Sequence, residues 1–265
     1  MGFDDPPPDA IEPNQMNRFL FHSWLVVGAC SIAPQAQDAP DGEVVSRAVR
    51  TVQPGPILAL PDLIEDILDA DDACPVLAVM EHGDDGLGTT RELWTGGCQL
   101  SDGTVVDGVL EWVAQPDGLW IAGEGFSITR DGNQELYVDG TLEIVEQQDL
   151  LLVDADATWC GHSALPCDGD PLTVDLRYSI YPAHQYPEIY DVTVSGVVAP
   201  GAPIAVEGSW RVDQRICATE PMDGVFALDD GQRHDLTLDG AVACDACAEW
   251  VVQGRAVSPF CDVAL

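Results

Sequence analysis

Residues 136–144 read Leu-Tyr-Val-Asp-Gly-Thr-Leu-Glu-Ile, and this stretch decides the fold class. Apolar side chains stand at every second position on both sides of Gly140: Leu136, Val138, Leu142 and Ile144. Successive side chains of an extended strand point to opposite faces, so these apolar residues share one face while their polar neighbours meet water. The stretch therefore predicts a β-strand with one buried face.

The same pattern recurs along the chain from Cys74 onward. Residues 204–212 repeat it with Ile204, Val206, Gly208, Trp210 and Val212, and partial copies centre on Gly108, Gly123, Gly196 and Gly240. Asp-Gly pairs, which are typical of tight turns, follow at residues 102–103, 117–118, 131–132 and 230–231. We therefore predict an all-β fold built as an antiparallel meander.

The central glycine of each repeat falls on the apolar side of its strand. A glycine there removes the side chain that would resist bending, which favours a barrel or a strongly curved sandwich. The alternative is that glycine makes room for a neighbouring aromatic ring such as Trp112 or Trp120. Both interpretations give the repeat a structural role.

One short helix is expected before the strands. Pro61 suits a first helical turn, and Asp62 is favourable near the positive end of the helix dipole. A weaker helical pattern covers residues 44–49, and the broken stretch at residues 54–56 separates the two. The helical spacing of the stronger pattern comes from Leu60, Leu63, Ile64, Ile67 and Leu68.

Residues 16–30 have the order of an export signal. A short basic start at residues 16–18 is followed by an apolar segment over residues 19–29, interrupted only by His22 and Ser23. The quartet Val27-Gly28-Ala29-Cys30 resembles the lipobox of bacterial lipoproteins. An ordinary secretory peptide and an uncleaved buried segment are the alternatives.

The lipobox resemblance implies that Cys30 receives a diacylglycerol with fatty acyl chains such as palmitate and becomes the mature N-terminus. Ser31 after it implies the outer membrane of a bacterial envelope, with a periplasmic or secreted protein as the alternative. Residues 1–15 then read as an upstream mis-start, 16–29 as a signal peptide and 30–43 as a lipidated tether. The β-rich domain covers 44–265, with two lobes that could meet near 159–171.

Eight cysteines remain once Cys30 is acylated, and this even number suits four disulfides in an exported protein. Cys74 with Cys98 and Cys160 with Cys167 are the natural local pairs. Three connectivities stay open among Cys217, Cys244, Cys247 and Cys261. A four-thiolate zinc site is the alternative for these last cysteines, but it usually needs a second close pair beside Cys244-x-x-Cys247.

The charge of the chain excludes nucleic acid as a partner. The formal net charge is −36, and all ten basic side chains are Arg. Removal of residues 1–29 takes away four acids and one Arg, which leaves a net charge of −33. A phosphate backbone would be repelled by such a surface, whereas a lipid anchor or a protein or glycan partner would not.

Sequence motifs for catalysis are weak. Residues 161–165 begin like the Gly-x-Ser-x-Gly elbow around Ser163, but Leu165 replaces the last glycine. No metal-ligand spacing connects His82, His162, His184 and His234. Calcium loops could use Asp69, Asp71 and Asp72, or Asp154 and Asp156, although solvated loop acids are the simpler interpretation. The alternation of the tyrosines at 178, 181, 186 and 190 favours cross-strand packing or a loop plug over an exposed binding face.

We therefore expect an envelope lipoprotein with a structural or recognition role at the cell surface or in the periplasm. No catalytic residue, metal ligand or cofactor is assigned, and a non-catalytic role is favoured. Two alternatives stay open: a secreted hydrolase, and a calcium-assisted adhesion or glycan-binding module. A cleft with converging polar groups would favour the hydrolase, and an exposed aromatic patch would favour binding.

Overall fold

The computed structural model describes residues 42–68, 74–83, 88–161, 167, 172–182, 189–199, 202–217, 221–238, 247–257 and 259–261. Three helices come first: α2 (Gly42–Thr51), α3 (Pro54–Leu58) and α4 (Leu60–Leu68). Fourteen strands follow: β1 (Val76–His82), β2 (Thr90–Thr95), β3 (Cys98–Gln99), β4 (Val105–Gln115), β5 (Gly118–Arg130), β6 (Asn133–Gln147), β7 (Leu150–Cys160), β8 (Leu172–Pro182), β9 (Ile189–Ala199), β10 (Ile204–Asp213), β11 (Asp223–Asp229), β12 (Arg233–Leu238), β13 (Ala248–Val252) and β14 (Arg255–Ala256).

These strands form a single antiparallel sheet. From β4 to β14 each strand pairs with the next one in the chain, while β2 and β3 both pair with β4. The predicted all-β meander is therefore confirmed. The sheet ends at β1 on one side and β14 on the other, so it is not closed into a barrel.

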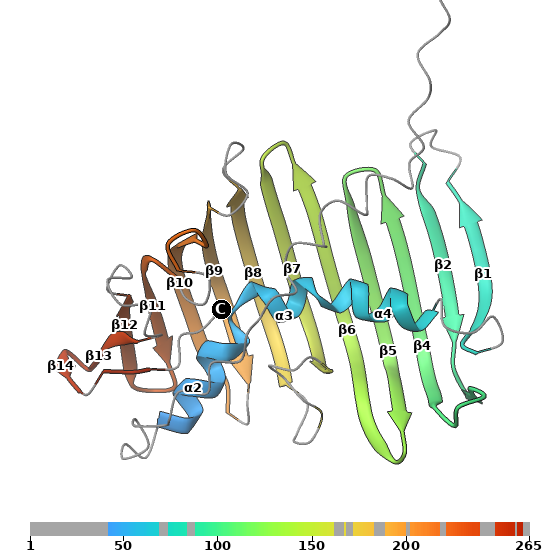
Figure 1. Cartoon of the computed structure of the whole chain (residues 1–265), viewed down its shortest axis with the longest axis horizontal. Coiled ribbons are helices and arrows are strands. Elements are labelled where there is room, and N and C mark those ends of the chain that lie inside the picture. Colours follow the sequence, from blue (N-terminus) through green and yellow to red (C-terminus); the bar gives the residue numbers. More distant parts are fainter. Residues whose placement is uncertain are drawn as a thin grey trace, which may run out of the picture.

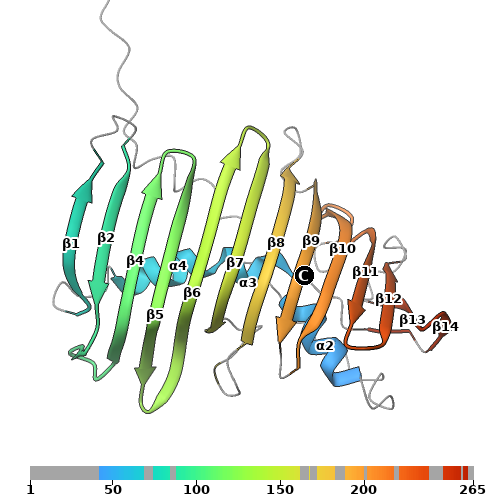
Figure 2. The ribbon, with the colours of Figure 1, turned by 180° about the vertical axis from the view of Figure 1, so that it is seen from behind.

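The three helices lie across one face of this sheet, which we call the inner face (Figure 1). Seen from behind, the opposite or outer face has none of the described helices over it (Figure 2). The side chains follow the alternation read from the sequence, since Leu136, Val138, Leu142 and Ile144 are all nearly fully buried. Burial of each such side chain stabilises the fold by roughly 1.5–3 kcal/mol. The core is therefore the layer between the inner face and the helices.

The expectation of a single short helix was wrong, because α2 and α3 also form, and α2 covers the weaker helical pattern at residues 44–49. The helix at residues 60–68 has the predicted apolar face, with Leu60, Ile64 and Leu68 buried. Residues 54–56, which were expected to be a break between two helical segments, instead form the start of α3, with Pro54 in its first turn. Proline is tolerated there because the first turn of a helix needs no backbone N–H donor.

The proposed meeting point of two lobes lies between β7 and β8. These two strands pair directly from Leu151 opposite Ile180 to Trp159 opposite Leu172. Of the connection between them, the structure describes only Gly161 and Cys167. The two-lobe organisation stays a prediction.

Gly140 shows why the repeat needs a glycine at its centre. Its φ is +125°, and a Cβ atom there would overlap the carbonyl oxygen of Asp156 and lie 2.6 Å from the Cα of Ala157 on β7. At Gly208 the nearest atom to an added Cβ would instead be aromatic, a ring carbon of Phe226 at 3.0 Å, and a ring carbon of Trp210 would lie at 3.3 Å. Backbone approach explains the first glycine and ring packing the second.

We predict that Gly140→Ala lowers the free energy of unfolding by about 2–3 kcal/mol, because the added methyl group strains φ and forces β6 away from β7. Urea unfolding followed by tryptophan fluorescence, with the disulfides intact, measures the change. Gly55→Ala is the matched control, since no heavy atom lies within 4 Å of the position that its added Cβ atom would take in α3. The control should be neutral or stabilise by about 0.5–1 kcal/mol, and equal losses in both variants would contradict the explanation.

Candidate functional site

The structure places few of the candidate catalytic residues. Ser163, His162 and His184 lie outside the described residues, as does the lipobox Cys30. His82 closes β1 at one end of the sheet, and His234 lies in β12 near the other end. The described part of the chain therefore does not bring these two histidines together.

His234 has the surroundings of a core residue. Its side chain is almost fully buried and stacks on Trp250, with ring centroids 5.9 Å apart. Its Nε2 atom lies 3.3 Å from the Oδ1 atom of Asp230. A structural role for His234 agrees with these contacts.

Both predicted local disulfides are present, and a third is added near the C-terminus. Cys74 is bonded to Cys98, and Cys160 to Cys167. Cys247 is bonded to Cys261, which rules out a zinc site that needs these two sulfurs as thiolates. Each bridge closes a loop and stabilises the fold by about 2–4 kcal/mol.

The two groups of residues predicted as calcium candidates have different outcomes. Asp69, Asp71 and Asp72 lie outside the described residues, whereas Asp154 and Asp156 lie on the outer face of β7. The Oδ2 atom of Asp154 accepts a hydrogen bond from Nε of Arg177 at 3.2 Å. Within the ranges that the structure covers, no three His, Cys, Asp or Glu side chains are grouped to hold a metal ion.

Two of the four tyrosines in the tyrosine-rich stretch enter the core. Tyr178 and Tyr190 are buried, while Tyr181 is half exposed and Tyr186 lies outside the described residues. Burial raises the pKa of Tyr178 and of Tyr190 well above the usual value. Cross-strand packing is therefore confirmed for these two residues.

A groove on the outer face runs across β7 to β12 among the described residues. It has a volume of about 750 Å³. Leu152 of β7 lines one end of this groove, directly opposite Ser179. From there the floor is a row of directly opposed residues, one from each of the strands β8 to β12: Ser179, Thr193, Ser209, Val225 and Thr237. Four gaps of about 4.8 Å between strands make this row roughly 19 Å long. We call it the hydroxyl row.

The hydroxyl row is uncharged in a chain whose net charge is −36. Charged side chains line the groove beside it: Arg177, Glu207, Arg233 and Asp235. Arg177 is paired with Asp154, and Arg233 donates to Asp235 at 2.8 Å. Because both guanidinium groups are engaged by carboxylates, the groove offers hydroxyl groups and the exposed Val225 methyl groups rather than a cationic site.

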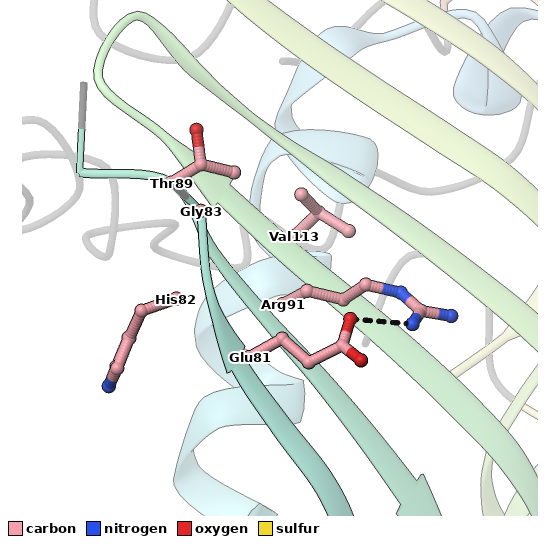
Figure 3. A pocket seen from close by; sticks show the side chains of 6 residues that line it. All are labelled: Glu81, His82, Gly83, Thr89, Arg91 and Val113. Atoms are coloured by element: carbon pink, nitrogen blue, oxygen red, sulfur yellow. Dashed lines mark hydrogen bonds and ion pairs between the residues drawn. The ribbon is translucent and has the colours of Figure 1, made fainter. Parts of the chain in front are cut away.

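A second, smaller hollow of about 460 Å³ lies at the edge of the sheet beside β1. Figure 3 shows Glu81 and Arg91 directed toward each other there, with His82 on the other side of the strand. Nη1 of Arg91 lies 3.0 Å from Glu81, and its Nε donates to Glu111. Both hydrogen bonds raise the pKa of Arg91, and the one to Glu111 has the larger effect.

Neither hollow could be located from the sequence. The alternating polar residues of each strand are visible, but the register that aligns Ser179, Thr193 and Ser209 is a property of the assembled sheet. Likewise, Glu81 and Glu111 stand 30 positions apart and meet only because β1 and β4 flank β2. The only sequence feature that pointed to the groove was the presence of Ser and Thr at outward positions of the strands.

No protein-family model, no curated protein and no solved structure matches this chain. Among the described residues, no helix has both the length and the apolar character needed to cross a membrane.

The three disulfides leave Cys217 and Cys244 as the remaining cysteines after Cys30. Cys217 is buried in the connection between β10 and β11, and Cys244 belongs to the connection between β12 and β13. The end of β12 and the start of β11 are neighbours, since Gly224 pairs with Leu238. We predict a fourth bridge between Cys217 and Cys244, which non-reducing peptide mapping should detect as one linked peptide pair. Free thiols at both positions would contradict this pairing.

Proposed function

We propose that this chain is a lipid-anchored bacterial envelope protein with a recognition role, and that its outer-face groove binds a neutral saccharide. The anchor would be a diacylglycerol on Cys30, followed by a tether over residues 31–43. The β domain would then stand away from an outer membrane. Strong curvature of its sheet, indicated by the glycine repeat, belongs to the same proposal.

The observation that carries the recognition role is the uncharged hydroxyl row. Acidic side chains occupy much of the outer face, and Asp156 stands directly opposite Asp175 just beyond the groove. Such like-charged pairs destabilise a sheet, and an acidic rim repels anionic ligands. A neutral ligand that bears hydroxyl groups fits the hydroxyl row without meeting this repulsion. A saccharide offers such hydroxyl groups together with small apolar patches for Val225 and Ala227.

The shape of the groove supports an extended ligand. Its floor crosses five strands, so a chain of several sugar rings would use its whole length, whereas a single ring would not. The groove is built on regular strands, and each of these strands is hydrogen-bonded to a neighbouring strand on both sides, which fixes the positions of the side chains. A preorganised surface of this kind loses little conformational entropy on binding.

The anchor predicts a specific loss of membrane attachment. With the full reading frame expressed in a bacterial host, the wild-type chain should fractionate with membranes and carry a diacylated N-terminus at Cys30 by intact mass. Cys30→Ala should abolish the acyl mass and move the protein to the soluble fraction, because acylation needs the thiol. A wild-type product that is soluble and free of lipid would overturn the anchor without touching the proposed groove.

The groove predicts saturable binding of uncharged tetrasaccharides of glucose or N-acetylglucosamine, measured by isothermal titration calorimetry on the soluble Cys30→Ala protein. Ser209→Trp places a large ring in the centre of the hydroxyl row and should weaken binding at least tenfold. Thr141→Trp is the matched control, since Thr141 is exposed on the outer face of β6 and does not line the groove.

Equal affinities in these two variants would place the saccharide elsewhere on the protein. Absence of binding to every tetrasaccharide tested would overturn the saccharide as the ligand. Thermal unfolding of both variants checks that neither ring disturbs the fold, because both substituted positions face water.

A further inference from the structure

The two edges of the sheet differ in how open they are. At one end β14 has only two residues, Arg255 and Ala256, which leaves a very short edge. At the other end β1 has seven residues and pairs only with β2 within the described chain. Natural sheets usually blunt such edges with proline, inward-pointing charge or brevity, because unpaired backbone groups attract another strand.

The backbone groups of β1 that no other described strand pairs with belong to particular residues. The N–H of Gly83 donates to the carbonyl oxygen of Thr89 at 2.8 Å, so this pair is hydrogen-bonded across β1 and β2. Bonded and non-bonded pairs alternate along an antiparallel ladder. Since Met80 stands opposite Glu92 and His82 opposite Thr90, both fall on non-bonded positions and turn their N–H and C=O groups away from β2.

The side chains around this edge are poorly covered. Met80 is 53% exposed and Val76 is 49% exposed, high values for apolar residues in a sheet. In Figure 1 the helix α4 ends before it reaches β1, so none of the described helices covers the inner side of this strand. A bulge between Leu77 and Val79 leaves the regular part of the edge at residues 79–82.

The charge at the edge selects the kind of strand that could pair there. On the outer face Glu81 and Glu111 share the single guanidinium group of Arg91, which leaves a net negative charge beside the 460 Å³ hollow. A basic side chain on an added strand would complement these acids, while an apolar side chain on its other face would cover Met80. A second copy of this acidic chain would instead be repelled.

We propose that β1 binds an extended peptide segment with alternating basic and apolar residues, which adds to the sheet as a further strand. The backbone of Met80 and His82 supplies the hydrogen bonds, and the acids around Arg91 select the charge. Such strand addition is a recurring mode of peptide recognition. It is independent of the saccharide groove, which lies on β7 to β12.

The test uses a fluorescein-labelled peptide of sequence RVRVRV with blocked termini, titrated with the soluble Cys30→Ala protein and followed by fluorescence anisotropy. Two control peptides are compared with RVRVRV, one with the same charge and one with the opposite charge. In the first, alternate amides are N-methylated, which keeps the charge and removes the donors of one edge. In the second, EVEVEV reverses the charge. We expect RVRVRV to bind and both controls to bind at least tenfold more weakly.

The protein variants test the same edge from the other side. Met80→Pro removes the outward N–H without removing a bond to β2, and an edge strand tolerates proline. Met80→Ala is the matched control, since it shortens the same side chain and keeps the N–H. We expect a loss of at least tenfold for Met80→Pro and a change of less than threefold for Met80→Ala. His82→Pro repeats the test if Met80→Pro does not fold.

Three outcomes would overturn the proposal. RVRVRV could fail to bind the unmodified β1. It could bind as well when N-methylated, which would show charge attraction alone. Light scattering could show a dimer that Met80→Pro dissociates, which would assign the edge to a second copy of the chain. The N-methylated peptide is compared on protein with an unmodified β1, so this comparison does not depend on the folding of any β1 variant.

Discussion

A continuous antiparallel backbone ladder is the constraint on which the rest of this structure depends. From β4 onward every strand pairs with its successor, so side chains of like parity align across the sheet in rows. Apolar rows face inward and must be covered, because their exposure would cost roughly 1.5–3 kcal/mol for each large side chain. The helices α2 to α4 supply that cover (Figure 1). The same ladder leaves the outer rows facing water.

The ladder also explains where the sheet tolerates no side chain. Gly140 faces the backbone of β7 so closely that a methyl group would overlap the carbonyl oxygen of Asp156. Disulfides then hold the segments next to strands, as between Cys74, just before β1, and Cys98 at the start of β3. Core packing stabilises the middle of the strands, and the disulfides link segments at or near strand ends.

Electrostatics divides the outer face into regions with different binding properties. Around β6 to β8 carboxylates stand opposite carboxylates, as for Glu143 and Asp154, and Arg177 offsets part of that repulsion. Farther along, the hydroxyl row carries no charge, and at the β1 edge two carboxylates share one guanidinium group. Neutral ligands would therefore be favoured at the hydroxyl row, and cationic ligands at the β1 edge.

The sequence by itself determined the strand class, the buried face of the strands around residues 136–144 and 204–212, and the helix at residues 60–68, because these follow from local periodicity. Two disulfides were also predictable, since Cys160 and Cys167 are close in the chain. Only the tertiary structure decided that the sheet stays open, since closure depends on whether β1 meets β14. It also decided the hydroxyl row and the Arg91 cluster, because cross-strand register joins residues that no short stretch of sequence contains.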